Sequence, residues 1–301
     1  MDFTGLSAFA LTPLLDDRLD EAAYISIIEK LRAAGVDSIG ALGSTGCYPY
    51  FSRSERASVL RLATEYSGAV PVIAGIGALR TRDVLWLAED AQKAGVSAVL
   101  LAPVSYHPLT EDEVFDLFAT VTRELSVPLC IYNNPNATHF NFSDELLARI
   151  AQLPNIGSIK IPPLAAELAP ELAPERVSAL RAQIPAEIRL GISGDGTAVE
   201  ALNAGCSVWY SVFGGLFPQA ALAISRAAMA GDIAQARQHT AALQPLWELF
   251  KRYGGSLRVI ATAAELLGVV KAPCLPAPLQ TLQGDARREV AQVIEQLRLT
   301  V

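Results

Sequence analysis

Short apolar segments recur along the chain at nearly regular intervals. Most are continuous rather than alternating, which is typical of parallel strands that helices cover on both faces. These segments predict strands over residues 5–11, 38–42, 70–76, 97–101, 127–132, 156–161, 188–193 and 207–212. The stretches between the first six have an amphipathic spacing, which predicts helices over residues 21–34, 54–66, 81–94, 110–125 and 144–152.

The residues at the ends of these helices support the same pattern. Two helix starts carry a Ser/Thr-x-x-Glu capping box, at Ser52–Glu55 and Thr110–Glu113. Glycines that suit the left-handed end of a helix precede three of the strands, at Gly35, Gly95 and Gly205. Eight strand–helix units predict an α/β protein with a (β/α)8 TIM barrel. An open doubly wound sheet is the alternative, but residues 11–14 offer no glycine-rich phosphate turn after the first strand.

The last part of the chain has a different pattern. After residue 218 only helices are predicted, over residues 219–230, 232–253, 257–267 and 284–299. We therefore expect a catalytic barrel over residues 1–218 and a C-terminal helical extension over 219–301. The apolar content of the extension indicates that it packs on the barrel or on another subunit.

Composition and charge exclude several classes of function. Hydrophobic residues make up 51% and charged residues 18% of the 301 residues, which excludes a disordered chain. The net charge of −7 has the wrong sign for a nucleic-acid or membrane-surface partner. Neither a signal peptide nor a membrane-spanning run is evident, so we expect a soluble, cytoplasmic protein. Its four widely spaced cysteines and three histidines predict no disulfide framework and no metal site.

One of the five lysines stands out. Lys160 lies between Ile159 and Ile161 in the sixth predicted strand, and alternation points it into the barrel together with Ser158. A rim lysine paired with a carboxylate is the structural alternative, but no acidic residue lies within four positions. Burial lowers the pKa of an amine, and a neutral amine forms a Schiff base with a ketone. This chemistry makes or breaks carbon–carbon bonds without a metal or a cofactor.

Polar residues follow other predicted strands where a barrel carries its chemistry. Tyr132 ends the fifth strand and points inward; it is either a proton-transferring phenol or an aromatic plug. The loop Gly43-Ser44-Thr45-Gly46 after the second strand offers hydroxyls and backbone N–H groups to a carboxylate. Ser193 and Ser211 end the seventh and eighth strands, where small residues leave room for a substrate.

These segments together resemble the dihydrodipicolinate synthase / N-acetylneuraminate lyase family of class I, Schiff-base-forming aldolases. The resemblance covers nearly the whole chain, including the loop 43–46, Tyr132-Asn133-Asn134-Pro135 and Gly157-Ser158-Ile159-Lys160. It implies a TIM barrel, a homo-oligomer (dimer or tetramer), and no cofactor. It further implies that Lys160 binds pyruvate or another 2-keto acid as an imine, that Tyr132 transfers protons, and that Ser44 and Thr45 hold the carboxylate.

The sequence departs from the family pattern at positions that select the second substrate. Cys47 stands where glutamate usually follows the loop, and residues 136–139 contain no arginine of the kind the synthases use. The second tyrosine of the synthases, which a neighbouring subunit donates, corresponds to Ser105, with Tyr106 one place later. Residues 162–174 resemble an insertion. We therefore expect a different aldol partner.

The resulting prediction is a lyase that cleaves or condenses 2-keto acids. Its alternatives are a dehydratase of 3-deoxy-2-keto sugar acids, 4-hydroxy-tetrahydrodipicolinate synthase itself, and a non-enzymatic keto-acid sensor. The predicted catalytic residues are Lys160, Tyr132 and Thr45. The predicted substrate-binding residues are Ser44, Thr45, Asn134, Thr138, His139, Ser193 and Ser211, with Tyr48 as a further specificity residue.

Overall fold

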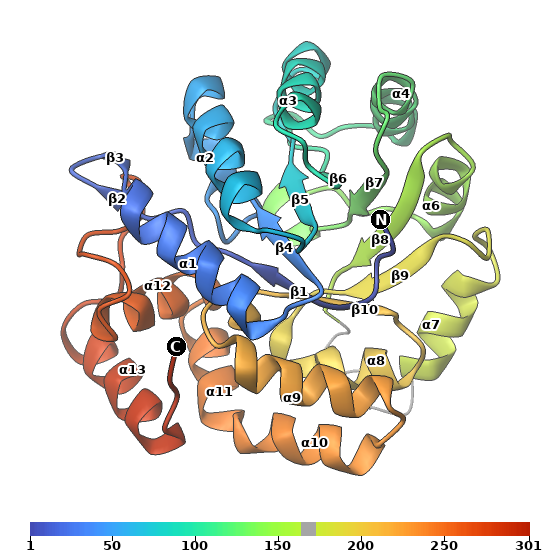
Figure 1. Cartoon of the computed structure of the whole chain (residues 1–301). Helices are drawn as coiled ribbons and strands as arrows, with labels where there is room; N and C mark the ends of the chain where they lie inside the picture. The colour runs from blue at the N-terminus through green and yellow to red at the C-terminus, as the bar shows by residue number, and fades with distance from the viewer. Residues whose placement is uncertain (164–172) are drawn as a thin grey trace.

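The computed structural model describes residues 1–163 and 173–301. Within these residues, eight parallel strands close into a barrel in which each strand pairs with its neighbours in the chain and the first pairs with the last (Figure 1). They are β1 (Gly5–Phe9), β4 (Ser38–Ala41), β5 (Val72–Gly75), β6 (Ala98–Leu101), β7 (Leu129–Tyr132), β8 (Ile156–Ile161), β9 (Arg189–Ile192) and β10 (Val208–Ser211). The predicted TIM barrel is therefore confirmed. A small hairpin, β2 (Leu14–Leu15) and β3 (Arg18–Leu19), follows the first strand.

Helices surround the barrel on its outer side (Figure 1). They are α1 (Glu21–Ala34), α2 (Arg53–Tyr66), α3 (Thr81–Lys93), α4 (Glu111–Thr122), α6 (Asp144–Ala151), α7 (Ala173–Arg181), α8 (Ala198–Asn203) and α9 (Pro218–Met229). Both predicted capping boxes are present, at the starts of α2 and α4. The three predicted helix-ending glycines have φ angles of 76° at Gly35, 81° at Gly95 and 108° at Gly205. Glycine, which has no Cβ, adopts such φ angles without steric strain.

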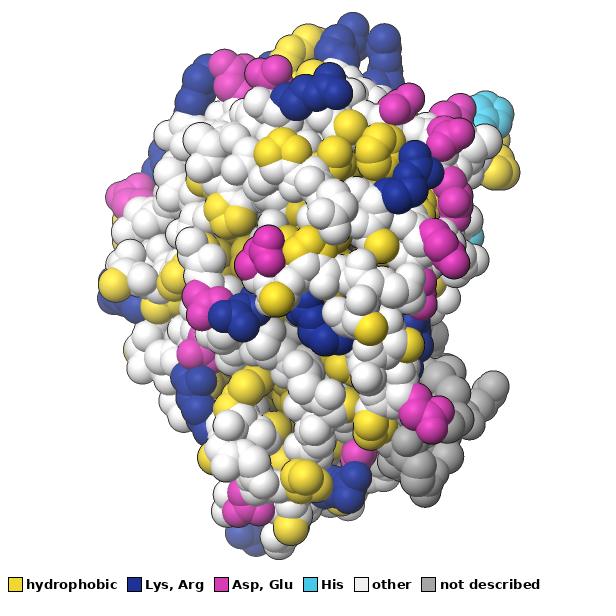
Figure 2. Space-filling view, turned by 90° about the vertical axis from the view of Figure 1, so that its right-hand side faces the viewer, with side chains coloured by type: hydrophobic (Ala, Val, Ile, Leu, Met, Phe, Trp, Pro, Cys, Tyr) yellow, Lys and Arg dark blue, Asp and Glu magenta, His cyan; other side chains and the backbone are white. Residues whose placement is uncertain are grey.

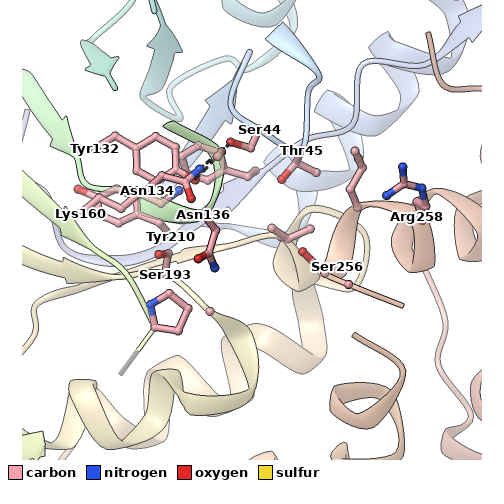
Figure 3. A pocket seen from close by; sticks show the side chains of 18 residues that line it. Ser44, Thr45, Tyr132, Asn134, Asn136, Lys160, Ser193, Tyr210, Ser256 and Arg258 are labelled. Atoms are coloured by element: carbon pink, nitrogen blue, oxygen red, sulfur yellow. Dashed lines mark hydrogen bonds between the residues drawn. The ribbon is translucent and has the colours of Figure 1, made fainter. Parts of the chain in front are cut away.

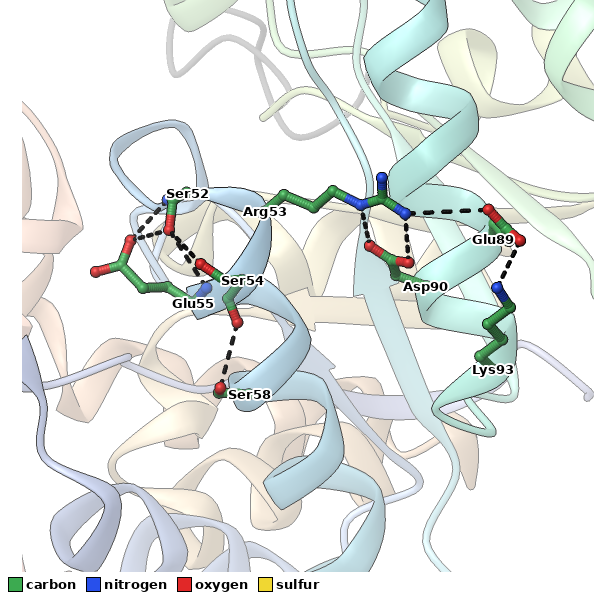
Figure 4. Close-up of polar contacts among 8 residues, drawn as sticks. All are labelled: Ser52, Arg53, Ser54, Glu55, Ser58, Glu89, Asp90 and Lys93. Carbon is green, nitrogen blue, oxygen red and sulfur yellow. Dashed lines mark hydrogen bonds and ion pairs between the residues drawn. The ribbon is translucent and has the colours of Figure 1, made fainter.

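The start of α2 also shows how neighbouring helices are joined on the surface (Figure 4). Ser52 caps the helix, and the carboxylate of Glu55 accepts the backbone N–H of Ser52 at 2.7 Å. The adjacent Arg53 donates to both carboxylate oxygens of Asp90 on α3, at 2.5 and 2.7 Å. Exposed ion pairs of this kind contribute little to stability, but the two-pronged geometry fixes the spacing of α2 and α3.

The core has two parts. A large apolar layer lies between the strands and the surrounding helices. A smaller cluster fills the inside of the barrel and includes Phe9, Cys130, Tyr132 and Tyr210. Inward-facing side chains of different strands thus meet in the barrel centre, as the alternation along parallel strands requires.

The C-terminal helices are α10 (Ile233–Ala242), α11 (Gln244–Arg252), α12 (Ser256–Leu266) and α13 (Gly284–Leu297). The helix predicted over residues 232–253 is two helices, because Pro245 stands in the first turn of α11 and a proline cannot continue a preceding helix. The predicted division at residue 218 needs a further correction. Helix α9 packs against β1, α1 and α8, so it is the eighth helix of the barrel rather than part of the extension.

The surface formed by α4, α6 and α7 carries acidic and basic side chains that are interspersed rather than separated by sign (Figure 2). Two ion pairs cross this surface, Arg149 with Asp112 and Arg176 with Asp144. In the part of the chain that the structure describes, no helix has both the length and the apolar content of a membrane span. Most of the insertion predicted over residues 162–174 lies outside the described residues.

Candidate active site

A cavity of about 390 Å³ opens where the barrel strands end (Figure 3). Its wall combines residues of several strand ends with the beginning of α12, which approaches from the C-terminal extension. Side chains from both parts line it, among them Ser44, Thr45, Tyr132, Lys160, Ser193 and Ser256. The predicted location of the site at the C-terminal strand ends therefore agrees with the observed cavity.

Lys160 lies on the inner side of β8 and is 4% exposed. Its Nζ is 3.9 Å from the ring centroid of Phe9, 4.2 Å from that of Tyr132 and 5.3 Å from that of Tyr210. Among the described residues, no hydrogen bond or ion pair reaches this nitrogen within the usual distances. Burial lowers the pKa of Lys160 from 10.5 to about 7, and the charges of Cys130 and Asp195 oppose this shift only in part.

Tyr132 is the neighbour of Lys160 across the β7–β8 pairing. Its phenol oxygen is 3.3 Å from the Ser44 hydroxyl, with which it shares a hydrogen bond, and it accepts the Asn134 Nδ2–H at 3.0 Å. Burial raises the pKa of Tyr132, so the phenol keeps its proton at neutral pH. Because Asn134 donates to the phenol oxygen, the phenol proton is free to point at Ser44 or at a bound molecule.

The loop after β4 brings Ser44 and Thr45 to the cavity. Gly43 allows this, because a Cβ there would lie only 2.4 Å from the ring of Phe9. Thr45 is 3% exposed, and its small, buried hydroxyl lies beside the space in front of Lys160. The loop at Gly43 and the Nζ of Lys160 thus both lie against the ring of Phe9, on the same cavity.

Ser193 and Ser211, both predicted to bind substrate, lie in different surroundings. Ser193 lines the cavity, although its hydroxyl donates to the backbone carbonyl of Ile161 at 2.9 Å. Ser211 is fully buried outside the lining, and its hydroxyl donates to Asp195 at 2.7 Å. Burial raises the pKa of Asp195 to about 6, whereas its bonds from Ser211 and the Phe213 N–H lower it. The Ser211–Asp195 pair holds the end of β10 against the turn that follows β9.

The residues predicted to select the second substrate do not all line the same cavity. Asn134 lines the main cavity, whereas Thr138 lines a neighbouring one and donates to the Asn134 carbonyl at 3.0 Å. Tyr48 lines that neighbouring cavity together with Cys47. His139 ends the one-turn helix α5 (Pro135–Thr138) and is exposed, so the structure does not bring it into either cavity.

The loop after β6 contains Ser105 and Tyr106, the two candidate positions for the second tyrosine of the synthases. The hydroxyl of Ser105 donates to the backbone carbonyl of His107. Tyr106 is 88% exposed and has its ring edge on the ring of His107. Neither side chain lines the cavity of its own chain among the described lining residues.

Several residues that line the cavity were not predicted, and three of them carry an aromatic ring or a charge. Phe9 and Tyr210 form the aromatic surroundings of Lys160, and strand alternation could have found them, since both lie on the inner side of terminal strands. Arg258 lines the cavity from the first turn of α12. No local sequence pattern predicts that Arg258 lines the cavity, because its position depends on how the C-terminal helices pack against the barrel. The described residues hold no group of three or more His, Cys, Asp or Glu side chains arranged to hold a metal ion.

A closed (β/α)8 barrel with a polar cavity at its strand ends has the architecture of the TIM-barrel enzymes, and a buried lysine beside a tyrosine there suits chemistry at a carbonyl carbon. The profile of the Dihydrodipicolinate synthetase family matches residues 2–297. The chain belongs to this family, and it is a lyase of the carbon–carbon type.

Known proteins of this family are similar over nearly the full length. The dihydrodipicolinate synthase of Agrobacterium tumefaciens has 44% identity and a TM-score of 0.93, and the match covers 98% of each chain. The 4-hydroxy-tetrahydrodipicolinate synthase of Nitrobacter hamburgensis is 32% identical over 279 residues, which is 91% of each chain. The protein of the same name from Anaplasma marginale is 30% identical over 302 residues, covering 99% of this chain and 96% of that one.

Proposed function

We propose that this lyase uses Lys160 to form an imine with pyruvate or another 2-keto acid, and then makes or breaks the adjacent carbon–carbon bond. The observation that carries the proposal is the state of Lys160, which is buried among three aromatic rings at the cavity wall. With its pKa lowered to about 7, a large fraction of the amine is neutral and nucleophilic at physiological pH. The proposed mechanism requires no metal and no cofactor.

In the first step, the 2-keto acid binds with its carboxylate at the Ser44–Thr45 loop. Hydroxyl and backbone N–H groups of such a tight loop suit a carboxylate. This orientation presents the keto carbon to the Lys160 Nζ. The neutral amine attacks that carbon, and the carbonyl oxygen takes a proton to become the hydroxyl of a carbinolamine.

Tyr132 is the group suited to this proton transfer. Its phenol lies beside Lys160 and is linked to Ser44 and Asn134. The phenol proton moves to the carbonyl oxygen as the carbon–nitrogen bond forms, and the attacking nitrogen gives one of its protons to the phenolate, which leaves the carbinolamine and a restored phenol. The phenol then protonates the carbinolamine hydroxyl, which departs as water while the nitrogen lone pair forms the protonated imine.

The protonated imine then serves as an electron sink. Loss of a proton from the neighbouring carbon gives an enamine, whose carbon attacks the carbonyl carbon of an aldehyde while the aldehyde oxygen takes a proton. Water hydrolyses the imine and frees Lys160. Cleavage follows the same steps in reverse, so the direction depends on the substrates supplied.

Borohydride trapping tests the proposal directly. The protein is incubated with pyruvate, reduced, digested and mapped by mass spectrometry, with Lys160→Gln as the control. We expect a reduced pyruvyl adduct on Lys160 and none in the variant. Absence of the adduct from the wild-type protein would exclude the imine mechanism.

The reaction itself is resolved by a substrate panel. Some relatives are named 4-hydroxy-tetrahydrodipicolinate synthase. Formation of 4-hydroxy-tetrahydrodipicolinate is therefore the first condensation to assay. Release of pyruvate from hydroxy-keto acids supports aldol cleavage, whereas loss of water from 3-deoxy-2-keto sugar acids supports dehydration. An adduct without turnover of any panel member supports the sensor.

We further infer that the protein works as a homo-oligomer. The support is a set of large apolar side chains that are exposed on the single chain, with Tyr106 at 88%, Leu79 at 66% and Tyr50 at 48%. Large apolar side chains with this degree of exposure suit burial against another subunit. Sedimentation equilibrium measures the mass, and a monomer at micromolar concentration contradicts this inference.

A further inference from the structure

Two tyrosines lie beside Lys160, and their hydroxyl groups have different surroundings (Figure 3). The ring centroids of Tyr132 and Tyr210 are 4.2 and 5.3 Å from the Lys160 Nζ. Burial raises the pKa of both phenols, so both keep their protons at neutral pH. The Tyr132 hydroxyl contacts Ser44 and Asn134 at the cavity. The Tyr210 hydroxyl lies deeper in the barrel and has other partners.

A chain of hydrogen bonds holds the Tyr210 hydroxyl. The Cys130 thiol donates to the Tyr210 oxygen at 3.3 Å, and the Ser158 hydroxyl oxygen lies 2.7 Å from that oxygen. Ser158 itself donates to the backbone carbonyl of Arg189 at 2.9 Å. A carbonyl oxygen only accepts, so the single hydroxyl proton of Ser158 is committed to Arg189, and Tyr210 donates to Ser158. The Tyr210 proton is therefore directed away from a molecule bound at Lys160.

This chain crosses the barrel interior below the cavity. Its four members come from the adjacent strands β7, β8, β9 and β10. The side chains of Cys130 and Ser158 are fully buried, and neither is among the described residues that line the cavity. Both ends of the chain are fixed, one at a thiol donor and the other at a backbone acceptor. Its arrangement therefore suits orientation of the tyrosine rather than proton transfer.

The ring of Tyr210 occupies the space next to the lysine amine. It is 1% exposed, lines the cavity, and stands edge-on to the ring of Phe9 at 6.0 Å and 81°. Gly191, the neighbour of Lys160 on β9, makes room for it, because a Cβ at Gly191 would lie 2.3 Å from the Tyr210 ring. Strand packing and the hydrogen bonds thus fix the ring in one place.

Water would enter this space if the ring were absent. The Ser158 hydroxyl and the Cys130 thiol would then line the space, which would also be open to the cavity. A polar space with room for water molecules fills with them. Water beside the Lys160 Nζ would stabilise its ammonium form, which does not attack a ketone.

We propose that Tyr210 is a positioning residue: its hydroxyl, held by Cys130 and Ser158, fixes its ring as the wall that keeps water from the inner side of the Lys160 amine. This proposal rests on the proposed function, because it takes the neutral amine as the group that reacts with the keto acid. The two phenols then have different tasks. Tyr132 transfers protons, whereas Tyr210 transfers none and acts through Lys160.

The charges around Lys160 determine how a pH profile is read. The titratable groups that contact or act on it among the described residues are Cys130 and Tyr132 on β7, Asp195 after β9 and Tyr210 on β10, while β1 contributes the ring of Phe9. The pKa of Cys130 is about 11 and that of Asp195 about 6. The charge of Asp195 raises the pKa of Lys160, so loss of its influence lowers the midpoint, whereas entry of water raises it.

The pH midpoint of borohydride trapping on Lys160, measured from pH 5 to pH 10 at limiting pyruvate, tests the proposal. Tyr210→Ala removes the ring and is expected to raise the midpoint by about one to two pH units, because water then reaches the amine. Tyr210→Leu fills part of the space and is expected to cause a smaller rise, which provides the test if Tyr210→Ala does not fold. Tyr210→Phe keeps the ring and is expected to keep the wild-type midpoint. Its rate is expected to fall less than about tenfold, short of the 100-fold or more that loss of an acid–base group typically costs.

Tyr24→Ala is the matched control. Tyr24 is as fully buried as Tyr210, but it lies on α1 in the outer apolar layer and is not among the described cavity residues. Its variant is expected to be less stable and to keep the wild-type midpoint. Acetylation by acetic anhydride, mapped by mass spectrometry, is a second readout, because it requires only the neutral amine of Lys160 and no keto acid.

Three results would overturn the proposal. The first is a wild-type midpoint in folded Tyr210→Ala and Tyr210→Leu. The second is a midpoint in Tyr210→Phe as high as that of Tyr210→Ala, which would assign the effect to the hydroxyl instead of the ring. The third is a rate loss in Tyr210→Phe of 100-fold or more, which would make its hydroxyl a proton donor. Failure of the proposed function is distinguishable, because the wild-type protein then forms no pyruvate adduct, while acetylation still measures the midpoint in every variant.

Discussion

The Nζ of Lys160 lies 3.9 Å from the ring centroid of Phe9, in a space with no described carboxylate in contact with it. An aromatic ring attracts the ammonium form weakly, whereas removal from water disfavours it strongly. Removal from water is the larger effect, because the pKa of Lys160 falls from 10.5 to about 7. The low pKa of the lysine is thus a consequence of the packing of the barrel interior.

The first prediction concerns the pH dependence of imine formation. Only the neutral amine attacks the ketone, so the rate of adduct formation at limiting pyruvate is expected to rise about tenfold per pH unit below pH 7 and to level off above it. Trapping time courses between pH 5 and pH 10 measure this. The exposed Lys93, read in the same peptide map, reports non-specific reaction. A midpoint near pH 10 would contradict the lowered pKa.

The second prediction is that removing the reactive amine stabilises the protein. Below about pH 7 both the folded and the unfolded chain hold the lysine proton, and the buried charge has its full cost. Between pH 7 and pH 10.5 only the unfolded chain holds it, so stability rises with pH and the cost disappears. Lys160→Met is expected to raise the free energy of unfolding by about 4 kcal/mol at pH 7 and by about 1 kcal/mol at pH 9.5.

Urea denaturation of the wild-type protein and the variant at both pH values measures this difference. Lys93→Met is the matched control, since Lys93 is exposed and pairs with Glu89 on the surface of α3. Its effect is expected to stay within about 0.5 kcal/mol at either pH. A Lys160→Met variant whose gain does not shrink at high pH shows that packing, rather than charge burial, causes the change.

The sequence was sufficient to predict the barrel because its determinants are local. Continuous apolar strands, capping boxes and helix-ending glycines repeat in each unit, and alternation alone turned Lys160 and Tyr132 inward. Helix α9 was assigned to the extension because its sequence does not reveal that it packs on β1 and α1. The break at Pro245 was visible in the sequence, yet the amphipathic pattern on both sides of it suggested one helix.

The residues of the candidate site that lie at strand ends could be predicted from the sequence. Those that reach the cavity through the packing of distant segments could not. Ser44, Thr45 and Asn134 line the cavity as expected, since each follows an inward-facing strand end. Ser211 ends a strand too, but its hydroxyl donates to Asp195, a contact that depends on how the segments after β9 and β10 pack. Arg258 reaches the cavity only through the return of the C-terminal helices, which no periodicity encodes.

The third prediction addresses Tyr132 as the proton-transferring group. Tyr132→Phe keeps the ring that packs on Lys160 and removes the hydroxyl that bonds Ser44 and Asn134. Loss of a general acid–base group typically costs about 100- to 10,000-fold in rate, and we expect a loss in this range for imine formation. Single-turnover trapping with saturating pyruvate measures it.

Tyr48→Phe is the control for this prediction. Tyr48 is also a buried tyrosine close to the site, but it lines the neighbouring cavity. Its variant is expected to form the imine within about threefold of the wild-type rate, since no described hydrogen bond joins the Tyr48 hydroxyl to Lys160, Tyr132 or Ser44. Equal losses in both variants would indicate a general disturbance of the barrel mouth instead of proton transfer by Tyr132.

The fourth prediction concerns the turn that brings α12 to the cavity. Gly255 has φ 130° and ψ 173°, a region that is almost exclusive to glycine, and no atom lies within 4 Å of an added Cβ. The cost of Gly255→Ala is therefore one of backbone conformation, about 1–3 kcal/mol in the free energy of unfolding. Relief of that strain moves the start of α12, which lines the cavity, so the variant is also expected to need a higher pyruvate concentration for half-saturating trapping on Lys160. Gly268→Ala, at the other end of the same helix with φ 69°, is expected to cost about 1 kcal/mol and to leave this concentration unchanged. A wild-type value in Gly255→Ala would show that the turn does not shape the cavity.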